Sequence, residues 1–342
     1  MAYTTINKST EHFNAKIYTG TGSSQSITGV GFQPDLVWTK ARNGVNSHLW
    51  YDKVRGVHKY LRSDKTAAEG NDTNTLTSFD SDGFTVGDGD NSNASGANGV
   101  AWNWKANGAG SSNTDGDVTS TVSVNTTSGF SIVKWDSTGT AGINIGHGLG
   151  QKPAMIIAKS TNIGTTNWPV YHQSLGATKY LSFNTTTLST TSATRWNNSE
   201  PTTTTFQTGS SGDIGGSDRT MIAYCFANIQ GYSKFGSYTG NGNADGTFVY
   251  TGFKPAFVIV KRSSDTQSWV LWDSKRDGYN QTNPSLTPNE DGAEETRSVD
   301  FLSNGFKNRQ NNTATNAAST YIYMAFAEHP FTSSTGTPVT AR

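Results

Sequence analysis

Short apolar runs recur along the chain and are separated by turns rich in Gly, Asn, Asp and Pro. The runs are about four to eight residues long, are rich in Val, Ile, Thr and aromatic side chains, and end in a turn about every ten residues. This spacing is typical of antiparallel sandwiches and jelly rolls. The pattern therefore predicts an all-β fold of antiparallel β-sandwich or jelly-roll modules.

One apolar run occurs three times, each time after a proline and each time ending in lysine. The three copies end at Lys40, Lys159 and Lys261, and each proline lies six residues before its lysine. Because these runs are apolar almost throughout, we expect central strands that are covered on both faces, and a neighbouring module could cover one face. The repetition predicts three tandem modules of one fold.

The run that follows alternates in polarity. In the first copy Trp50 and Asp52 fall on one face and Tyr51 on the other, because successive side chains of a strand point in opposite directions. The other copies have His172 and Asp273 in place of Asp52. Such a swap favours a polar structural role over a catalytic one.

Aromatic residues of the same run supply the candidate binding residues. Trp168 and Trp269 share one repeat position, which favours a place in the core. Tyr51, Tyr171 and Trp272 share the opposite face. We predict for these three an interface between modules or subunits, with a sugar-stacking platform as the second choice.

Each copy closes on a strand whose aromatic side chains lie two residues apart, such as Trp102 and Trp104. With these ends the modules cover residues 13–108, 129–229 and 231–330. Both separate beads and a compact pseudo-threefold unit fit the pattern, and we favour the compact unit.

The segments between and after the modules differ in length. Residues 109–128 are rich in Gly, Ser, Thr and Asn, which predicts a flexible linker or a polar surface loop. The second junction is much shorter, so we expect modules two and three to pack together, with module one hinged. The tail, residues 331–342, is expected to be a frayed end or a short contact arm.

Charge and cysteine content narrow the classes of protein. The chain has 26 basic and 26 acidic residues, so no net field recruits nucleic acid or an anionic membrane. Cys225 is the only cysteine; it lies in an apolar strand and is expected to be an inert core residue. The first residues lack the apolar segment of a secretion signal, and no stretch approaches the roughly 18 apolar residues of a membrane span.

Residues that suggest chemistry are better explained as turns. Asp80 and Asp82 lie in the turn FDSDGF, but the other copies lack acids at these positions, whereas a glycosidase needs a fixed pair. The acidic loops 87–93 and 289–295 lack EF-hand spacing, so we expect no cofactor, with low-affinity calcium as a minor alternative. The glycines of 146–150 precede a strand, not the helix of a phosphate loop. We expect no catalytic and no metal site, and hence no enzyme.

The motifs of the first module closely resemble a repeat of virion proteins of tailed phages, notably marine phages and cyanophages. They are TGVGFQPDLVWTK, HLWYDKVRGVHKYLRS, TLTSFDSDGFTV and VAWNWKANG. The third module matches through TGFKPAFVIVK, WVLWDS, FLSNGF and YMAFAEHPF, and the second matches more loosely. The resemblance implies lectin-like β-sandwich modules in a noncatalytic virion structural protein, and it transfers no functional residues.

The resemblance implies a place in the phage particle, after assembly in the host cytoplasm. We expect a tail fibre or tail-associated component that binds a host cell-surface glycan or protein and contacts other virion proteins of the tail or capsid. A capsid appendage or decoration protein is the first alternative, a polysaccharide depolymerase the second, and a cellular carbohydrate-binding module the third. Repeated attachment sites predict a homo-oligomer, preferably a trimer, with no nucleic-acid partner and no membrane insertion.

Overall fold

The computed structural model describes residues 4–329, and its regular structure is almost entirely β. The all-β prediction is confirmed, and the pairings between these strands are antiparallel. The helices are single turns: η1 (Ser9–Glu11), α1 (Asp90–Asn93) and α2 (Ala193–Trp196). None of the helices in the described residues is long and apolar enough to cross a membrane.

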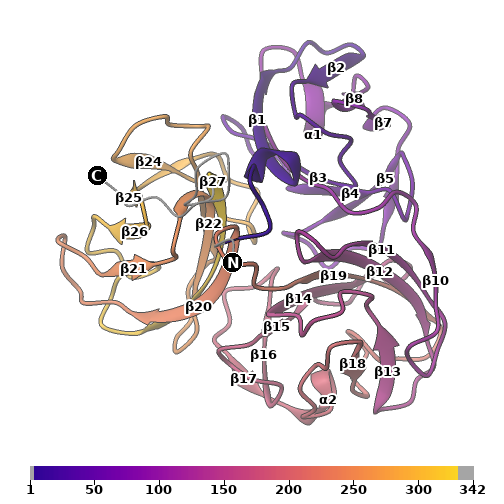
Figure 1. Cartoon of the computed structure of the whole chain (residues 1–342). Helices are drawn as coiled ribbons and strands as arrows, with labels where there is room; N and C mark the ends of the chain where they lie inside the picture. Colours follow the sequence, from indigo (N-terminus) through magenta and orange to yellow (C-terminus); the bar gives the residue numbers. More distant parts are fainter. Residues whose placement is uncertain (1–3, 330–342) are drawn as a thin grey trace.

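The strands gather into three lobes, each built from one continuous stretch of sequence (Figure 1). Lobe 1 holds strands β1 to β9, lobe 2 holds β10 to β19 and lobe 3 holds β20 to β27. In each lobe the inner sheet faces the other two lobes, and a second sheet covers its outer face. The division into tandem modules with the bounds 13–108, 129–229 and 231–330 stays a prediction.

Lobe 1 pairs an inner sheet of order β1-β9-β3-β4-β5-β6 with an outer sheet of order β2-β8-β7. The hairpin between β7 and β8 turns at Gly83, where φ is +152° and a Cβ atom would lie 1.9 Å from the carbonyl oxygen of Ile27, so only glycine fits. The strands are β1 (Phe13–Thr19), β2 (Gln25–Thr28), β3 (Leu36–Ala41), β4 (Leu49–Asp52), β5 (Lys59–Arg62), β6 (Gly70–Asn71), β7 (Leu76–Asp80), β8 (Gly83–Val86) and β9 (Asn98–Trp104).

Lobe 2 has an inner sheet of order β10-β11-β12-β19-β14-β15-β16-β17 and a small outer sheet of β13 and β18. The strands are β10 (Ser111–Asn113), β11 (Ser120–Asn125), β12 (Phe130–Ser137), β13 (Ile143–Gly146), β14 (Met155–Ser160), β15 (Pro169–His172), β16 (Lys179–Ser182), β17 (Thr190–Thr191), β18 (Thr205–Thr208) and β19 (Arg219–Phe226).

The prediction of a flexible linker over residues 109–128 is wrong. Its β10 and β11 extend the inner sheet of lobe 2, with Val122 paired to Val133. Val122 is buried in the lobe 2 core and Val124 packs against that core. The alternation of valine and polar residues in TVSVN makes this stretch a strand, despite its Gly- and Ser-rich neighbours.

Lobe 3 has an inner sheet of order β20-β27-β22-β23 and an outer sheet of order β21-β26-β25-β24. The predicted C-terminal tail, residues 331–342, lies outside the described residues. The strands are β20 (Ser233–Thr239), β21 (Phe248–Tyr250), β22 (Lys254–Arg262), β23 (Val270–Asp273), β24 (Thr282–Ser285), β25 (Glu295–Leu302), β26 (Gly305–Asn308) and β27 (Thr320–His329).

One large apolar core joins the three lobes. The repeated strands β3, β14 and β22 alternate side chains between two cores, as expected of strands covered on both faces. In β3, Trp38 enters the shared core while Val37 enters the core of lobe 1. In β22, Ile259 enters the shared core while Val258 enters the core of lobe 3. The prediction that a neighbouring module covers one face of these strands is confirmed.

The expectation of a hinged first module is wrong. Backbone hydrogen bonds link lobe 1 to lobe 2, from Glu69 N to Thr161 O (2.7 Å), and to lobe 3, from Glu294 N to Arg42 O (2.8 Å). The Trp-rich inner face of lobe 1 is apolar, and burying it against both neighbours is more favourable than leaving it in water. Lobe 1 is therefore packed against both neighbours.

Candidate functional site

The predicted binding residues Tyr51, Tyr171 and Trp272 are fully buried and lie in three different cores. Each points away from the lobe junctions and is covered by the outer part of its own lobe. Tyr171 packs edge-on against Trp196, and the indole of Trp272 donates a 2.6 Å hydrogen bond to the carbonyl oxygen of Arg297. Both predicted roles, interface and sugar platform, are therefore wrong for these residues.

The interface between lobes is built from the opposite face of the same strands. Trp50 of lobe 1 packs against Trp168 of lobe 2, with ring centroids 5.6 Å apart. The indole of Trp168 donates to the carbonyl oxygen of Lys65 in lobe 1, and that of Trp269 in lobe 3 donates to Ser182 in lobe 2, both at 3.1 Å. The core role predicted for Trp168 and Trp269 is confirmed, and this core is shared between lobes.

The three residues at the end of β4, β15 and β23 form a closed ring of polar contacts between lobes. Asp52 of lobe 1 accepts a 2.8 Å hydrogen bond from the Tyr224 hydroxyl of lobe 2. Asp273 of lobe 3 accepts a 3.0 Å hydrogen bond from the indole of Trp102 in lobe 1. His172 of lobe 2 places Nε2 3.1 Å from the carbonyl oxygen of Tyr323 in lobe 3. These contacts join neighbouring lobes, which is the polar structural role predicted for these positions.

The substitution of histidine for aspartate at one position of this ring coincides with two other changes. Three residues after each aspartate, Arg55 and Arg276 contact their carboxylates through Nε at 2.5 Å. Lobe 2 has Leu175 at the corresponding place, and lobe 3 has Met324 where the other lobes offer Tyr224 or Trp102. A buried carboxylate needs such charged partners, whereas a neutral imidazole is satisfied by the Tyr323 carbonyl at Nε2 and by the backbone N–H of Ser174, which donates to Nδ1 at 3.2 Å.

Burial and a neighbouring carbonyl explain the state of His172. Desolvation lowers the pKa of His172 to about 4, and the hydrogen bond to Tyr323 opposes this only in part. His147, in the glycine-rich turn before β14, is also fully buried, and desolvation lowers its pKa to about 4. Both imidazoles are therefore neutral at pH 7, and these residues act in packing and hydrogen bonding.

The repeat lysines Lys40, Lys159 and Lys261 are buried at the ends of β3, β14 and β22. Desolvation lowers the pKa of Lys40 and Lys159 to about 8 and that of Lys261 to about 7. Each ammonium group donates to the backbone carbonyl of the next residue, and Lys261 also reaches Thr186 O of lobe 2 at 3.2 Å. These lysines stabilise turns, and the side chains do not meet in one site.

The loop acids are also bound in turns. Asp82 accepts hydrogen bonds from the backbone N–H groups of Gly29 (2.9 Å) and Gly31 (2.6 Å), and these hydrogen bonds lower its pKa. Asp80 accepts from the hydroxyl groups of Ser78 and Thr85, both at 2.7 Å. Over residues 4–329, no three His, Cys, Asp or Glu side chains gather in an arrangement that could hold a metal ion. Cys225 is fully buried, as predicted.

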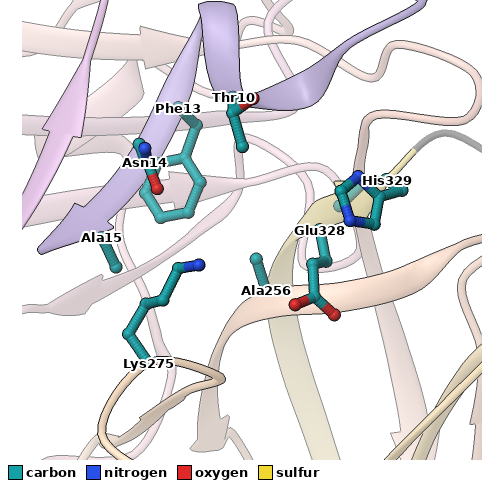
Figure 2. A pocket seen from close by; sticks show the side chains of 9 residues that line it. Thr10, Phe13, Asn14, Ala15, Ala256, Lys275, Glu328 and His329 are labelled. Carbon is teal, nitrogen blue, oxygen red and sulfur yellow. The ribbon is translucent and has the colours of Figure 1, made fainter. Parts of the chain in front are cut away.

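Hollows open at the surface of each lobe junction. Figure 2 shows a very small one, of about 40 Å³, between β1 of lobe 1 and the lobe 3 strands β22 and β27. Lys275 and Glu328 extend towards it from lobe 3, and Phe13 and Asn14 line it from lobe 1. A neighbouring hollow along β1 measures about 230 Å³, and one between lobes 1 and 2 about 380 Å³. The cavity in Figure 2 has room for only a few water molecules.

The largest of these hollows, of about 600 Å³, is the groove between lobes 2 and 3, which we call the 2–3 groove. Its size lies in the range of ligand-binding pockets. Lobe 2 contributes Gln173, Asn228 and Gln230, and lobe 3 contributes Lys234 and Tyr250. Sequence reasoning missed these residues. One signal in the sequence could have pointed to the groove. In β21 the buried Val249 lies between the exposed Phe248 and Tyr250, and the alternation of β-strand side chains predicts that these two rings share the outer face.

A family model described as a domain of unknown function (DUF7483) matches residues 8–330, which is almost the whole chain. No curated protein and no solved structure matches the chain.

Proposed function

The chain belongs to the DUF7483 family of domains of unknown function, and we propose that it is a noncatalytic structural protein of a phage virion. Within the particle it is a tail fibre or tail-associated component that takes part in host adsorption. Its surface loops and grooves contact a glycan or protein of the host cell. The proposal rests on the resemblance of its repeat motifs to those of tailed-phage virion proteins.

The observation that carries the proposal furthest is the core shared by the three lobes. Trp50, Trp168 and Trp269, one from each lobe, are buried in it together. A body locked in this way is rigid, since no lobe can move without exposing apolar surface to water. Rigid scaffolds with variable loops suit attachment to a particle and recognition of a surface.

The proposal excludes a catalytic role because the polar groups with suggestive chemistry already have structural partners. Asp52 and Asp273 are paired with arginines, and Asp82 is bound by backbone N–H groups. A general acid or base must instead be free to reach a substrate. The alternative is a polysaccharide depolymerase. Release of oligosaccharides when the protein is incubated with host polysaccharide would support it.

Within the particle the protein contacts other virion proteins of the tail or capsid, and we expect a homo-oligomer, preferably a trimer. Fibres and appendages attach at sites related by symmetry, which favours closed oligomers. Mass photometry of the purified protein measures this directly. A mass of one chain at all concentrations would contradict the oligomer but not the place in the virion.

Localisation in the particle is the decisive experiment. Antibodies raised against the protein, visualised by immunogold electron microscopy, should label the tail of purified phage particles. Labelling of the capsid would support an appendage or decoration protein instead. Particles that carry no label, with the protein present in infected-cell lysates, would overturn the proposed virion role.

A further inference from the structure

The 2–3 groove differs from the other junction hollows described above in having an exposed tyrosine ring on its wall. Tyr250 lines it and is 55% exposed, while its neighbour Val249 is buried beneath. The lining residues of the other hollows include one Phe, Tyr or Trp ring, that of Phe13, which is 1% exposed, and the imidazole of His329. A ring on a rigid strand offers a large contact area at a small entropic cost, because tyrosine has few rotatable bonds.

The charge in the groove comes from Lys234. Its ammonium group lies 4.9 Å from the centre of the Tyr250 ring, which is a cation–π contact. Within residues 4–329 the Lys234 side chain makes no hydrogen bond and no ion pair. No carboxylate pairs with it there, and the lining of the groove contains no acidic side chain. Partial burial lowers the pKa of Lys234, as expected of an ammonium group that has lost water without gaining a counter-ion.

Amide side chains also line the groove. Gln173 donates to the carbonyl oxygen of Phe235 at 2.6 Å, and Asn228 donates to Gln173 at 3.0 Å. The backbone N–H of Phe235 in turn donates to Asn228 at 3.0 Å. This network holds the two amides in fixed orientations and leaves each with donor or acceptor capacity unused, while Gln230 is exposed beside them.

We propose that the 2–3 groove binds an acidic saccharide, a pyranose that carries a carboxylate or sulfate group. The C–H face of the sugar ring packs on Tyr250, the anionic group pairs with Lys234, and the amides of Gln173, Asn228 and Gln230 bond the hydroxyl groups. Aromatic ring, cation and amides together are what such a ligand requires, whereas a neutral apolar ligand would leave the amides and the ammonium group unpaired. This inference rests on the proposed function, for which it names the class of receptor.

The test measures binding of three probes by isothermal titration calorimetry: trigalacturonic acid, a sulfated carrageenan trisaccharide and neutral cellotriose. At least one acidic probe should bind, and the two acidic probes separate carboxylate from sulfate as the anionic group. Lys234→Gln should weaken the acidic probe by about tenfold, and Tyr250→Ala should abolish measurable binding. Affinity should also fall as the salt concentration rises.

Two matched variants control for changes elsewhere on the surface. Tyr279→Ala removes another exposed tyrosine, 85% exposed, and Lys275→Gln removes a lysine from the hollows between lobes 3 and 1. Both should bind the probe within about twofold of the wild type, which is a small free-energy difference. Thermal unfolding of all four variants should match the wild type, since none of the side chains lies in a core.

Three results would overturn the inference: no binding of either acidic probe, equal binding by Tyr250→Ala, or tighter binding of cellotriose than of both acidic probes. Failure here and failure of the proposed function are distinguishable. Virion labelling without acidic-saccharide binding would leave the virion role and remove this site. Saccharide binding by a protein missing from the particle would keep the site and remove the virion role.

Discussion

Replacement of His172 by aspartate should destabilise the protein, because the junction of lobes 2 and 3 lacks the partners that a carboxylate needs. His172 is fully buried, and its Nε2 lies 3.1 Å from the carbonyl oxygen of Tyr323. At the other two junctions the carboxylate has an arginine at 2.5 Å and accepts a hydrogen bond from an aromatic residue of another lobe, the Tyr224 hydroxyl or the Trp102 indole. Leu175 and Met324 stand at those two places here.

The magnitude follows from the cost of keeping a buried carboxyl group neutral. Without a cation the aspartate at this position is protonated, and protonation at pH 7 of a group with an unfolded-state pKa of about 3.9 costs about 4 kcal/mol. At pH 5 the same cost is about 1.5 kcal/mol. Asparagine has nearly the same shape as aspartate and cannot ionise. Both His172→Asp and His172→Asn lose the imidazole, so the difference in their stability isolates the cost of protonating the carboxyl group.

A second substitution should restore much of the loss. In the H172D background, Leu175→Arg should recover at least about 2 kcal/mol, because the guanidinium would pair with the carboxylate as Arg55 pairs with Asp52. Another nitrogen of this arginine would reach the carbonyl oxygen of Val170, two residues before position 172. In the wild-type background the same substitution should destabilise, since it would bury a guanidinium beside a neutral imidazole.

The assay is urea unfolding of the four proteins of this double-mutant cycle and of His172→Asn, followed by tryptophan fluorescence at pH 5 and pH 7. The expected coupling energy is at least about 2 kcal/mol at pH 7, well above the roughly 0.5 kcal/mol of independent sites. Equal stability of H172D and His172→Asn at pH 7 would refute the reasoning. So would a coupling energy near zero.

Three further predictions concern pH and backbone geometry. Burial lowers the pKa of His147 and His172 to about 4, below the unfolded value of about 6.5, so stability present at pH 7 should fall by up to about 3 kcal/mol per histidine between pH 6.5 and 4. Urea midpoints across this range should show a shallower fall in His147→Gln than in the wild type. Burial also lowers the pKa of the three repeat lysines to about 7 or 8, so between pH 8 and 10 the unfolded chain binds more protons than the folded chain. The free energy of unfolding should therefore rise towards pH 10, and it should rise less in Lys159→Met. A flat profile would contradict this. Gly83→Ala should cost at least about 2 kcal/mol in a thermal-unfolding assay, whereas Gly278→Ala, where a Cβ atom meets nothing within 4 Å, should stay within about 0.5 kcal/mol of the wild type.

The strands themselves could be predicted because alternation of apolar and polar residues is a local property. The runs that end at Lys40, Lys159 and Lys261 are buried along their whole length as β3, β14 and β22. The same reasoning, applied to TVSVN, predicts β11, and composition misled there because the flanking Gly and Ser residues outweighed two valines in the average.

The candidate site could not be predicted, because it depends on which neighbour covers each face. Tyr51 and Trp50 are both large, aromatic and buried, and the sequence offers no reason to send one to its own lobe and the other to the junction. The 2–3 groove brings together residues far apart in the sequence, such as Gln173 of lobe 2 and Phe235 of lobe 3, which lie 62 positions apart. Their contact is a consequence of how lobe 2 rests on lobe 3.

The sequence by itself determined the all-β fold, the repeat and the two-sided burial of its central strands, since these follow from periodicity within a few residues. Only the tertiary structure decided that the Trp-rich faces meet in one shared core, that the supposed linker is part of a sheet, and that Tyr250 and Lys234 line an open groove. The physical reason is that a strand with two apolar faces must bury both of them. The hydrophobic effect has no direction, however, and does not specify which element covers each face.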